Sequence, residues 1–245
     1  MTSPLFLVAP GTLPDGTGQV HLDGPEGRHA ADVQRLAPGE RVILSDTRGR
    51  YAVCTVEQAG RGSLDLRVEE LGEEPEPEVR LVLVQALAKG ERDLMAVEAA
   101  TELDVDEVVP WQADRSIVRW RAERADRAHR RWEQTVAAAA KQSRRVRVPA
   151  VAPLAHRADL LARVGAADLA LVLHEAAEDR LEGVSLPAAG EVLLVVGPEG
   201  GISGDELTAL TSAGARPVRL GSAVLRTSTA GPAALAALHT LRGWR

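Results

Sequence analysis

The fold is best predicted from the stretch VLLVVGPEGGIS, residues 192–203. Its first five residues are all apolar, which is typical of a strand buried on both faces of a parallel sheet. The GPEGG that follows cannot continue the strand, because proline lacks a backbone N–H and glycine favours tight turns. Ser203 stands where it can cap a helix predicted over residues 203–213. The stretch therefore predicts a strand, a turn and a helix, the repeating unit of an α/β domain.

The same alternation of strand and helix extends from residue 79 to the end of the chain. The predicted strands span residues 79–86, 106–110, 169–174, 192–196 and 217–220, and the predicted helices span residues 91–103, 121–143, 203–213 and 229–241. Because the strands are nearly all apolar, they predict a parallel sheet covered by helices on both faces. Ligands of such sheets bind beyond the carboxyl ends of the strands.

The first seventy residues follow a different pattern. Short runs rich in β-branched residues lie at 41–45, 51–57 and 64–69, separated by glycine-containing turns, with one plausible helix over residues 29–36. This pattern predicts a small barrel or sandwich. The GEEPEPE stretch at residues 72–78 suits a linker, since its prolines break regular structure and its like charges repel. We therefore predict domains at residues 1–72 and 80–245, joined by a linker at 73–79.

The composition is that of a globular protein. Apolar residues make up 45% and charged residues 26% of the chain. No apolar run approaches the roughly 20 residues that cross a bilayer, and the amino terminus lacks the basic segment of a secretory signal. Cys54 is the single cysteine, which excludes a disulfide within the chain and a Cys-based zinc site. We expect a cytoplasmic protein without a bound metal.

The net charge of −6 hides an uneven distribution of charge. Acidic residues concentrate at positions 69–78, and basic residues concentrate between positions 115 and 147. The basic residues are Arg115, Arg119, Arg121, Arg124, Arg127, Arg130, Arg131, Lys141, Arg144, Arg145 and Arg147. Such a stripe can bind a phosphate backbone even on an acidic protein, because salt screens charges beyond about 8–10 Å. The alternative is a solvated helix face with Glu123, Asp126 and Glu133 as local partners.

Three predicted strands end in motifs that are candidates for a ligand site. They are LHE at residues 173–175, GPEGG at 197–201, and LG at 220–221 followed by SAVLRTSTA at 222–230. Glycine lets the backbone approach a ligand closely. The dinucleotide fingerprint and the P-loop are both absent from the sequence. Taken alone, GPEGG is better explained as a plain turn, and His174 as a hydrogen-bonded structural residue.

The motifs taken together, in their order along the chain, resemble those of the RsmE-type 16S rRNA uracil-N3 methyltransferases. The order is KGER at residues 89–92, TEL at 101–103, DRS at 114–116, KQSRR at 141–145, VP at 148–149, LHE, GPEGG, LG and LRTSTA. The resemblance covers essentially the whole chain. It implies a trefoil-knot α/β domain of the SPOUT superfamily with a parallel sheet, preceded by a small PUA-like β-barrel domain. It also implies S-adenosylmethionine as cofactor, 16S rRNA or the small ribosomal subunit as partner, and a homodimer formed through the knotted domain.

The resemblance also implies which residues form the site. Those expected to bind the cofactor are Leu173, His174, Gly197, Pro198, Glu199, Gly201, Leu220, Gly221, Val224, Leu225 and Thr227. Arg226 is the expected catalytic cation, which would stabilise negative charge on the uracil carbonyls. Glu199 is expected to be a base or a ligand contact, and an acid at a helix N-terminus is an equal alternative. Ser228 stands where many family members have glutamate, so no carboxylate at that position can be required.

RNA contacts are expected from basic residues of both domains. They are Arg28, His29, Arg35, Lys89, Arg115, Arg144 and Arg145. A plain solvated turn is an equal alternative for Lys89, and a structural role is an alternative for His29. The target uridine must leave its stack to expose N3. Because aromatics are only 2% of the chain, Trp111, Trp120 and Trp132 are interpreted as packing or rim residues.

Three other functions remain open on the sequence. One is a related knotted enzyme that methylates tRNA or a ribose 2′-hydroxyl. Another is a non-catalytic ribosome-assembly factor that binds RNA without the cofactor. The third is an ordinary doubly wound nucleotide enzyme, which the missing glycine fingerprint disfavours.

Overall fold

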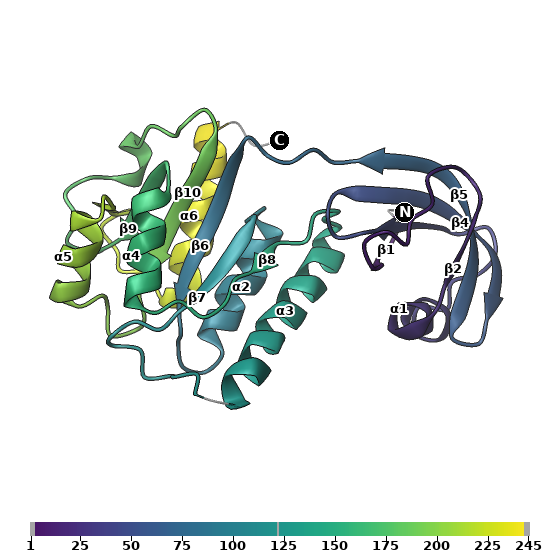
Figure 1. The fold of residues 1–245 in the computed structure, drawn as a ribbon, viewed down its shortest axis with the longest axis horizontal. Helices are drawn as coiled ribbons and strands as arrows, with labels where there is room; N and C mark the ends of the chain where they lie inside the picture. The colour runs from purple at the N-terminus through teal and green to yellow at the C-terminus, as the bar shows by residue number, and fades with distance from the viewer. Residues whose placement is uncertain (1–2, 122, 243–245) are drawn as a thin grey trace. The chain divides into compact units, whose positions relative to one another are not determined.

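The structure is a computed structural model that describes residues 3–121 and 123–242. The chain folds into two compact units (Figure 1). One comprises Met1–Glu76 with Ala140–Val148, and the other comprises Pro77–Ala139 with Pro149–Arg245. The predicted partition at residues 1–72, 73–79 and 80–245 stays a prediction; contacts divide the chain after Glu76 and assign Ala140–Val148 to the N-terminal unit. The predicted chain ends at 1 and 245, and residue 122 of the predicted third helix, lie outside the described residues.

The N-terminal unit is built on a five-stranded sheet. Its order is β1 (Leu5–Leu7), β3 (Arg41–Ser45), β4 (Arg50–Gly60), β5 (Ser63–Glu73) and β2 (Gln19–Leu22). A short helix, α1 (Gly24–Arg28), continues directly into a π-helical turn, η1 (His29–Val33). The three predicted strands are confirmed, two of them longer than expected. The helix begins earlier than the predicted residue 29, and β1 and β2 were not predicted.

The core of this unit follows from the two-residue period of its strands. Ala52, Cys54 and Val56 of β4 are buried, and so are Leu64 and Leu66 of β5. Their neighbours in sequence are more exposed, because successive side chains of a strand point to opposite faces. Burial raises the pKa of the Cys54 thiol to about 11. Cys54 is therefore a protonated core residue rather than a reactive one.

The segment Ala140–Val148 is tied to this unit by polar contacts. The Ser45 hydroxyl donates to the carbonyl of Val146 at 2.6 Å, and the Val148 N–H donates to the carbonyl of Thr47 at 3.1 Å. These bonds satisfy backbone groups that would otherwise have to be solvated. The N-terminal unit is therefore assembled from two separate pieces of the chain.

The C-terminal unit is built on a parallel sheet of six described strands, as the sequence predicts. The order is β11 (Arg216–Val218), β9 (Leu169–Leu173), β10 (Gly190–Val196), β6 (Val79–Ala86), β7 (Glu107–Trp111) and β8 (Ala150–Val151). Every neighbouring pair is parallel. The loops that follow the strands therefore meet at one edge of the sheet.

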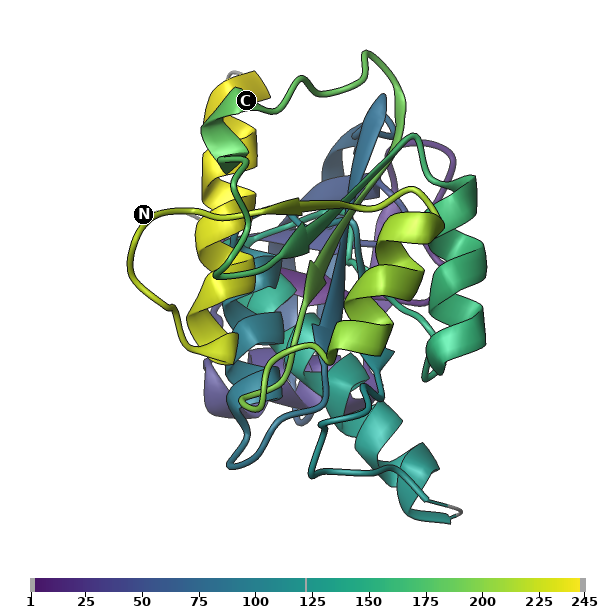
Figure 2. The same cartoon turned by 90° about the vertical axis from the view of Figure 1, so that its left-hand side faces the viewer.

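Helices cover both faces of this sheet. They are α2 (Arg92–Glu102), α3 (Glu123–Ser143), α4 (Arg157–Ala166), α5 (Gly204–Ser212) and α6 (Thr227–Arg242), with a short 3-10 turn, η2 (Leu181–Gly183). Figure 2 shows α4 and α5 on one side of the sheet and α6 on the other. The helix α4 and the short strand β8 were not predicted.

Alternation within β6 shows how the two faces are filled. Val82 and Val84 share a core cluster with Leu160 and Val164 of α4. On the other face α6 packs so closely that a Cβ at Gly231 would lie 2.9 Å from Leu83. Both faces of the strand are buried from Leu81 to Val84, which explains the apolar sequence of this stretch.

The chain that leaves β11 runs beside the segment that follows β9. The Arg219 N–H donates to the Asp179 carbonyl at 3.0 Å, and the Leu181 N–H donates to the Arg219 carbonyl at 2.9 Å. The chain then enters α6, which packs against η2, β6 and β10. The trefoil knot stays a prediction. None of the described helices has the length and apolar character needed to cross a membrane.

Candidate active site

A cavity of about 490 Å³ lies at the carboxyl ends of the strands of the C-terminal unit. Its volume falls within the roughly 300–1,000 Å³ typical of small-molecule sites. The loops after β9 and β10 and the segment that leads into α6 form its walls. The lining residues are Arg92, Arg115, Leu173, His174, Glu175, Val196, Gly197, Pro198, Glu199, Gly200, Gly201, Ile202, Val224, Leu225, Arg226, Thr227 and Ala230. Motifs far apart in the sequence thus line one cavity.

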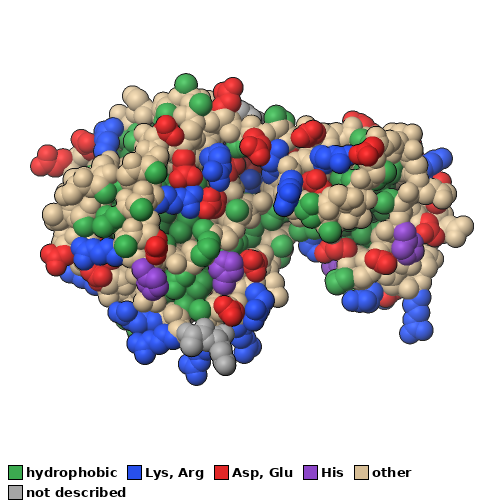
Figure 3. Space-filling view, in the orientation of Figure 1, with side chains coloured by type: hydrophobic (Ala, Val, Ile, Leu, Met, Phe, Trp, Pro, Cys, Tyr) green, Lys and Arg blue, Asp and Glu red, His purple; other side chains and the backbone are tan. Residues whose placement is uncertain are grey.

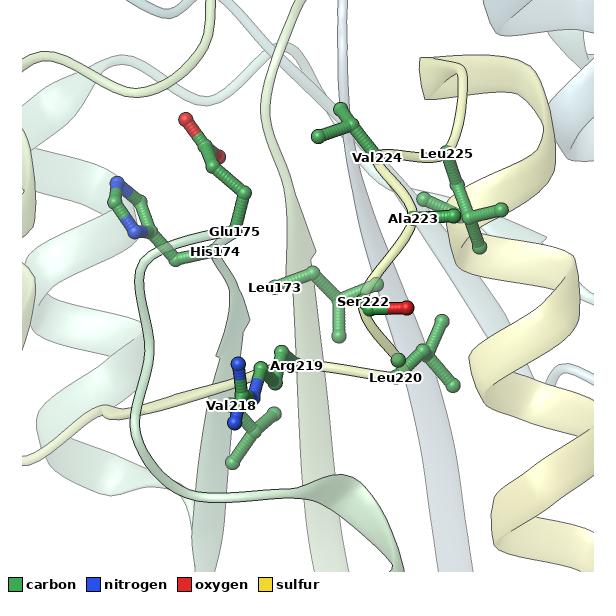
Figure 4. Close-up of a pocket in the computed structure, with 12 residues that line it drawn as sticks. Leu173, His174, Glu175, Val218, Arg219, Leu220, Ser222, Ala223, Val224 and Leu225 are labelled. Carbon is green, nitrogen blue, oxygen red and sulfur yellow. The ribbon is translucent and has the colours of Figure 1, made fainter.

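A smaller hollow adjoins this cavity and shares several of its residues. The segment 218–225 forms one wall, and residues 173–175 form another. In Figure 4 the side chain of Leu173 points towards the segment 220–225, whereas the ring of His174 points away from it. Val224 is 78% exposed and Leu225 is 37% exposed. Exposed apolar side chains beside a cavity suit the apolar part of a ligand.

The turn after β10 requires its glycines. A Cβ at Gly197 would lie 2.7 Å from the Ile202 side chain, and Gly201 has a φ of +70° that other residues rarely adopt. The turn is closed by the Gly201 N–H, which donates to the Pro198 carbonyl at 2.9 Å. Ser203 then caps α5, where its hydroxyl accepts from the N–H of Glu206 at 3.2 Å. The predicted turn and cap are both confirmed.

Glu199 joins this turn to the loop before α2. Its Oε1 accepts from the backbone N–H of Lys89 at 3.0 Å and from the Arg92 guanidinium at 3.1 Å. The first turn of α5 has its own capping box, formed by Ser203 and Glu206. Glu199 therefore bonds to the KGER motif, while the N-terminus of α5 is capped by Ser203 and Glu206.

The DRS motif holds the same turn from another side. The Arg115 guanidinium donates to the carbonyl of Gly200 at 3.0 Å. Asp114 accepts from the Ser203 hydroxyl at 3.0 Å, and its own N–H donates to Glu206 at 2.7 Å. Arg115 was predicted to contact RNA, and the structure places it in the wall of the cavity.

Thr227, at the start of α6, connects the last motif to the centre of the sheet. Its hydroxyl donates to the carbonyl of Gly197 at 2.8 Å and accepts from the Gln85 amide at 2.9 Å. Both Thr227 and Gln85 are buried. A buried polar group that lacks a hydrogen-bond partner destabilises the fold. This chain of bonds therefore fixes the position of α6 relative to the turn after β10.

Arg226 precedes this anchored threonine. Its carbonyl accepts from the N–H groups of Thr229 and Ala230, at 2.8 and 2.9 Å, so its backbone opens α6. Its side chain is exposed and lines the cavity. Within residues 3–121 and 123–242, its guanidinium forms no ion pair. A cation held ready at a ligand site without a partner is available to an anionic group.

His174 makes local hydrogen bonds. Its backbone N–H donates to the Val218 carbonyl at 3.0 Å, and its Nδ1 accepts from the N–H of Ala176 at 3.2 Å. The proton of a neutral ring is then on Nε2. These bonds fit the structural interpretation of this histidine.

The predicted site residues divide into two groups in the structure. The expected cofactor residues and Arg226 all line the cavity or the adjoining hollow, Leu220 and Gly221 in the hollow only. Arg28, His29, Arg35, Arg144 and Arg145 lie in the N-terminal unit. Lys89 is exposed, and its backbone contacts Glu199. Sequence reasoning did not assign Arg92 or Arg219 to the site, although Arg92 lies in the quoted KGER motif, and it named Glu175 only as part of the LHE motif.

Comparison with known proteins adds to this geometry. Residues 74–239 match the family described as the RNA methyltransferase domain, and residues 22–69 match the RNA methyltransferase PUA domain. The chain is 47% identical to the ribosomal RNA small subunit methyltransferase E of Mycobacterium bovis, over 98% of this chain and 93% of the relative. It is 30% identical to the protein of the same name from Bacillus subtilis, over 89% and 88%.

Solved structures are similar over nearly the whole chain. A ribosomal RNA small subunit methyltransferase E from Neisseria gonorrhoeae, bound to S-adenosyl methionine, has a TM-score of 0.86 at 27% identity and covers 98% of both chains. A putative methyltransferase from Legionella pneumophila, in complex with the same cofactor, has a TM-score of 0.86 at 26% identity, also over 98% of both chains.

The parallel α/β unit, its cavity and the preceding PUA-like unit together define an RNA methyltransferase. This class agrees with the order of the motifs along the chain. The chain belongs to the ribosomal RNA small subunit methyltransferase E family.

Proposed function

We propose that the protein transfers the methyl group of S-adenosylmethionine to N3 of a uridine in the 16S RNA of the small ribosomal subunit. The observation that carries the proposal is the cavity at the carboxyl ends of the strands, where Arg226 stands beside the backbone of the GPEGG turn. The similar structures that contain S-adenosylmethionine support this choice of cofactor. The cytoplasm is the proposed site of action, since small subunits are there.

The cavity fits such a cofactor in size and in lining. Its volume of about 490 Å³ suits a ligand the size of a nucleoside joined to an amino acid. Leu173, Val224 and Leu225 offer apolar contacts for a base, and the glycines at 197 and 201 let the backbone approach polar groups. The expected cofactor residues named above would hold it. When bound, the cofactor supplies an electrophilic methyl group on a sulfonium.

The chain's own contribution is to position and polarise the uracil. N3 carries a proton at neutral pH and becomes a good nucleophile only when that proton passes to a base, either Glu199 or solvent water. As it leaves, negative charge develops on the uracil carbonyl oxygens, where the Arg226 guanidinium would stabilise it. Holding N3 in line with the methyl group supplies a further large share of the rate. Thr227, anchored to Gly197 and Gln85, fixes the backbone that carries Arg226.

RNA binding is proposed to involve both units. Arg28, His29 and Arg35 lie on α1, η1 and the residues after them, while Arg144 and Arg145 follow α3 in the same unit. Arginine contacts to phosphates position RNA without reading its sequence. Lys89 and Arg115 are the proposed contacts of the C-terminal unit, with Arg115 also supporting the turn at Gly200.

We also propose that the protein is a homodimer formed through the C-terminal unit. Met95 of α2 and Leu241 of α6 are 56% and 45% exposed, and these two helices pack against each other. Exposed apolar side chains on neighbouring helices suit a protein interface. Sedimentation of the purified protein at several concentrations tests this, and a monomer throughout would contradict it.

The methylation experiment uses the nucleosides of ribosomal RNA. A strain lacking the gene should lose 3-methyluridine from its 16S RNA by mass spectrometry, and the wild-type gene should restore it. Persistence of 3-methyluridine would contradict the uridine assignment. Loss of a modified tRNA nucleoside or a 2′-O-methyl group instead would identify a different acceptor. A purified protein that shows no heat of binding with S-adenosylmethionine would favour the non-catalytic assembly factor.

A further inference from the structure

A second cavity of the C-terminal unit, of about 320 Å³, lies beside the loop before α2. Glu91 and Asp93 line this cavity, whereas Arg92 between them lines the candidate active site. The KGER loop is therefore shared by the walls of both cavities. The other walls are residues 118–120 and one face of α3. This cavity has no role in the reaction described so far.

The α3 face combines cationic and aromatic side chains. Arg124, Ala128, Arg131 and Trp132 line the cavity, and their spacing places them on one side of a helix that turns about 100° per residue. Trp120 is half-buried and meets Trp132 edge-on, with ring centroids 5.7 Å apart at 89°. Trp132 itself is 2% exposed. The buried ring thus fixes the accessible one at the cavity wall.

Three arginines line this cavity. Arg131 pairs with Glu91, and the other two are available to an anion. Arg124 is exposed, and its side chain forms no ion pair in the part of the chain that the structure describes. Arg119 is also exposed, and its guanidinium donates a long hydrogen bond of 3.5 Å to the Asp114 carbonyl. Lys and Arg side chains gather around the start of α3 (Figure 3).

Asp93 adds a hydrogen-bond acceptor to the wall. It is 6% exposed, and its Oδ2 accepts from the N–H of Ala88 at 3.4 Å while its Oδ1 accepts from the N–H of Leu94 at 2.9 Å. Burial, helped by the nearby charge of Glu199, raises the pKa of Asp93. The walls of this cavity therefore include a flat aromatic surface, two exposed guanidinium groups and a buried carboxyl.

We infer that this cavity binds a second, unmethylated nucleotide of the RNA, with its base against Trp120 and its phosphate between Arg119 and Arg124. The inference rests on the proposed function and assigns to Trp120 a role beyond packing. Aromatic surfaces beside cationic grooves are the means by which proteins bind single-stranded nucleic acid. The volume, at the small end of ligand sites, suits one nucleotide. An extruded uridine is held more accurately when the strand near it is fixed at a second point.

The test compares variants on small subunits that lack the methyl mark. Trp120→Ala should raise KM for the subunit about 5- to 100-fold, with kcat and the calorimetric Kd for the cofactor within about twofold of wild type. Trp120→Phe keeps an aromatic face and should restore most of the KM. Arg124→Ala should raise KM several-fold and reduce the slope of log KM against log salt by about 0.7. Arg130→Ala, the matched control, removes the same charge from an exposed position of α3 that does not line the cavity.

The outcomes separate this inference from the proposed function. If the wild-type enzyme methylates the subunit while Trp120→Ala and Arg124→Ala keep the wild-type KM, the nucleotide site is wrong and the proposed function stands. If the wild type transfers no methyl group to the subunit, the proposed function fails first. If Trp120→Ala does not fold, Trp120→Leu fills the space without an aromatic face and replaces it with the same expectation. An equal effect of Arg130→Ala and Arg124→Ala would mean a diffuse electrostatic surface and would overturn the site.

Discussion

The two edges of the C-terminal sheet use charge in opposite ways. At the amino ends of the strands, Arg163 of α4 donates to both carboxylate oxygens of Glu107, at 2.6 and 2.7 Å, and to Glu191 at 2.9 Å. Arg80 pairs with the same two carboxylates. At the carboxyl ends, Arg226 lines an open cavity and forms no ion pair with any residue that the structure describes. One edge holds its charges in pairs, and the other leaves a cation for a ligand.

This difference shows where the unit gains stability and where it retains function. The paired edge joins β7, β6 and β10 through side chains that are largely shielded from water; Glu107 is 12% exposed and Arg163 is 25% exposed. Two parallel N–H···O bonds between arginine and carboxylate are among the stronger charged contacts in proteins. A stable framework at one edge allows glycine-rich loops and an exposed cation at the other.

The largest effect that the comparison predicts is at the open edge. Arg226→Ala should lower kcat about 100- to 1,000-fold, roughly 3–4 kcal/mol in the barrier, because it removes the cation that faces the developing charge. Single-turnover methylation measures the effect. The melting temperature and the cofactor Kd should stay close to wild type, since the side chain is exposed. The matched control is Arg216→Ala, another exposed arginine, which should keep normal kcat. Full activity of Arg226→Ala would remove its catalytic role.

The paired edge should give the reverse result. Arg163→Ala should destabilise the fold by about 2–3 kcal/mol in urea unfolding, because it leaves two partly buried carboxylates short of their cation. Activity per folded molecule should be unchanged. Arg157→Ala on the same helix is the control: its pair with Asp114 is 4.0 Å long and 44% exposed on the arginine side, so its effect should be small. A loss of kcat in Arg163→Ala without a loss of stability would contradict the stabilising role of the paired edge.

The sequence predicts the open edge better than the paired one, for a physical reason. In a parallel sheet every strand end falls at the same edge, so GPEGG and LRTSTA are brought together by strand order alone. The contacts that set their geometry depend on packing between distant residues. Gln85 bonds to Thr227, 142 positions away, and Lys89 bonds to Glu199, 110 positions away. No local pattern encodes such pairs.

The elements missed by sequence analysis have equally local reasons. The strands β1 and β2 have three and four residues, too few to show a period of two. The helix α4 begins after His156, a residue that rarely caps helices, although Asp159 accepts its N–H at 2.9 Å. Glu107 of β7 and Glu191 of β10 bond to Arg163 of this helix. In the sequence alone, both glutamates look like ordinary surface acids. The ion pairs depend on the position of α4 over the sheet, which the sequence does not show.

A smaller effect is expected from acid. Burial alone would raise the pKa of Glu107, but the hydrogen bonds and charges of Arg163 and Arg80 outweigh it and lower that pKa. A carboxyl with a lowered folded pKa contributes stability that is present above its unfolded pKa, near 4.3, and is lost as pH falls through the folded pKa. Wild-type stability should therefore decline below about pH 5. Glu107→Gln should cost about 1–2 kcal/mol at pH 7 and flatten this decline. An unchanged acid profile would mean that the pair contributes little.

The smallest effect is expected at Glu199, a carboxylate at the cavity edge of the sheet that is nevertheless held in an ion pair. It lines the open cavity, yet its Oε1 is paired with Arg92 and the Lys89 N–H. If the role of Glu199 is to hold the KGER loop in place, Glu199→Gln keeps an acceptor for the Lys89 N–H and loses one half-exposed ion pair. The value of kcat/KM should then fall only a few-fold. Arg92→Ala should then produce a similar loss. If Glu199 is instead the base that takes the N3 proton, Glu199→Gln should lower kcat 100-fold or more and change the pH profile, while Arg92→Ala should not. Because the hydrogen bonds of Glu199 run to the KGER loop, we expect the first result. The paired carboxylate then supports the site, and the exposed Arg226 acts in it.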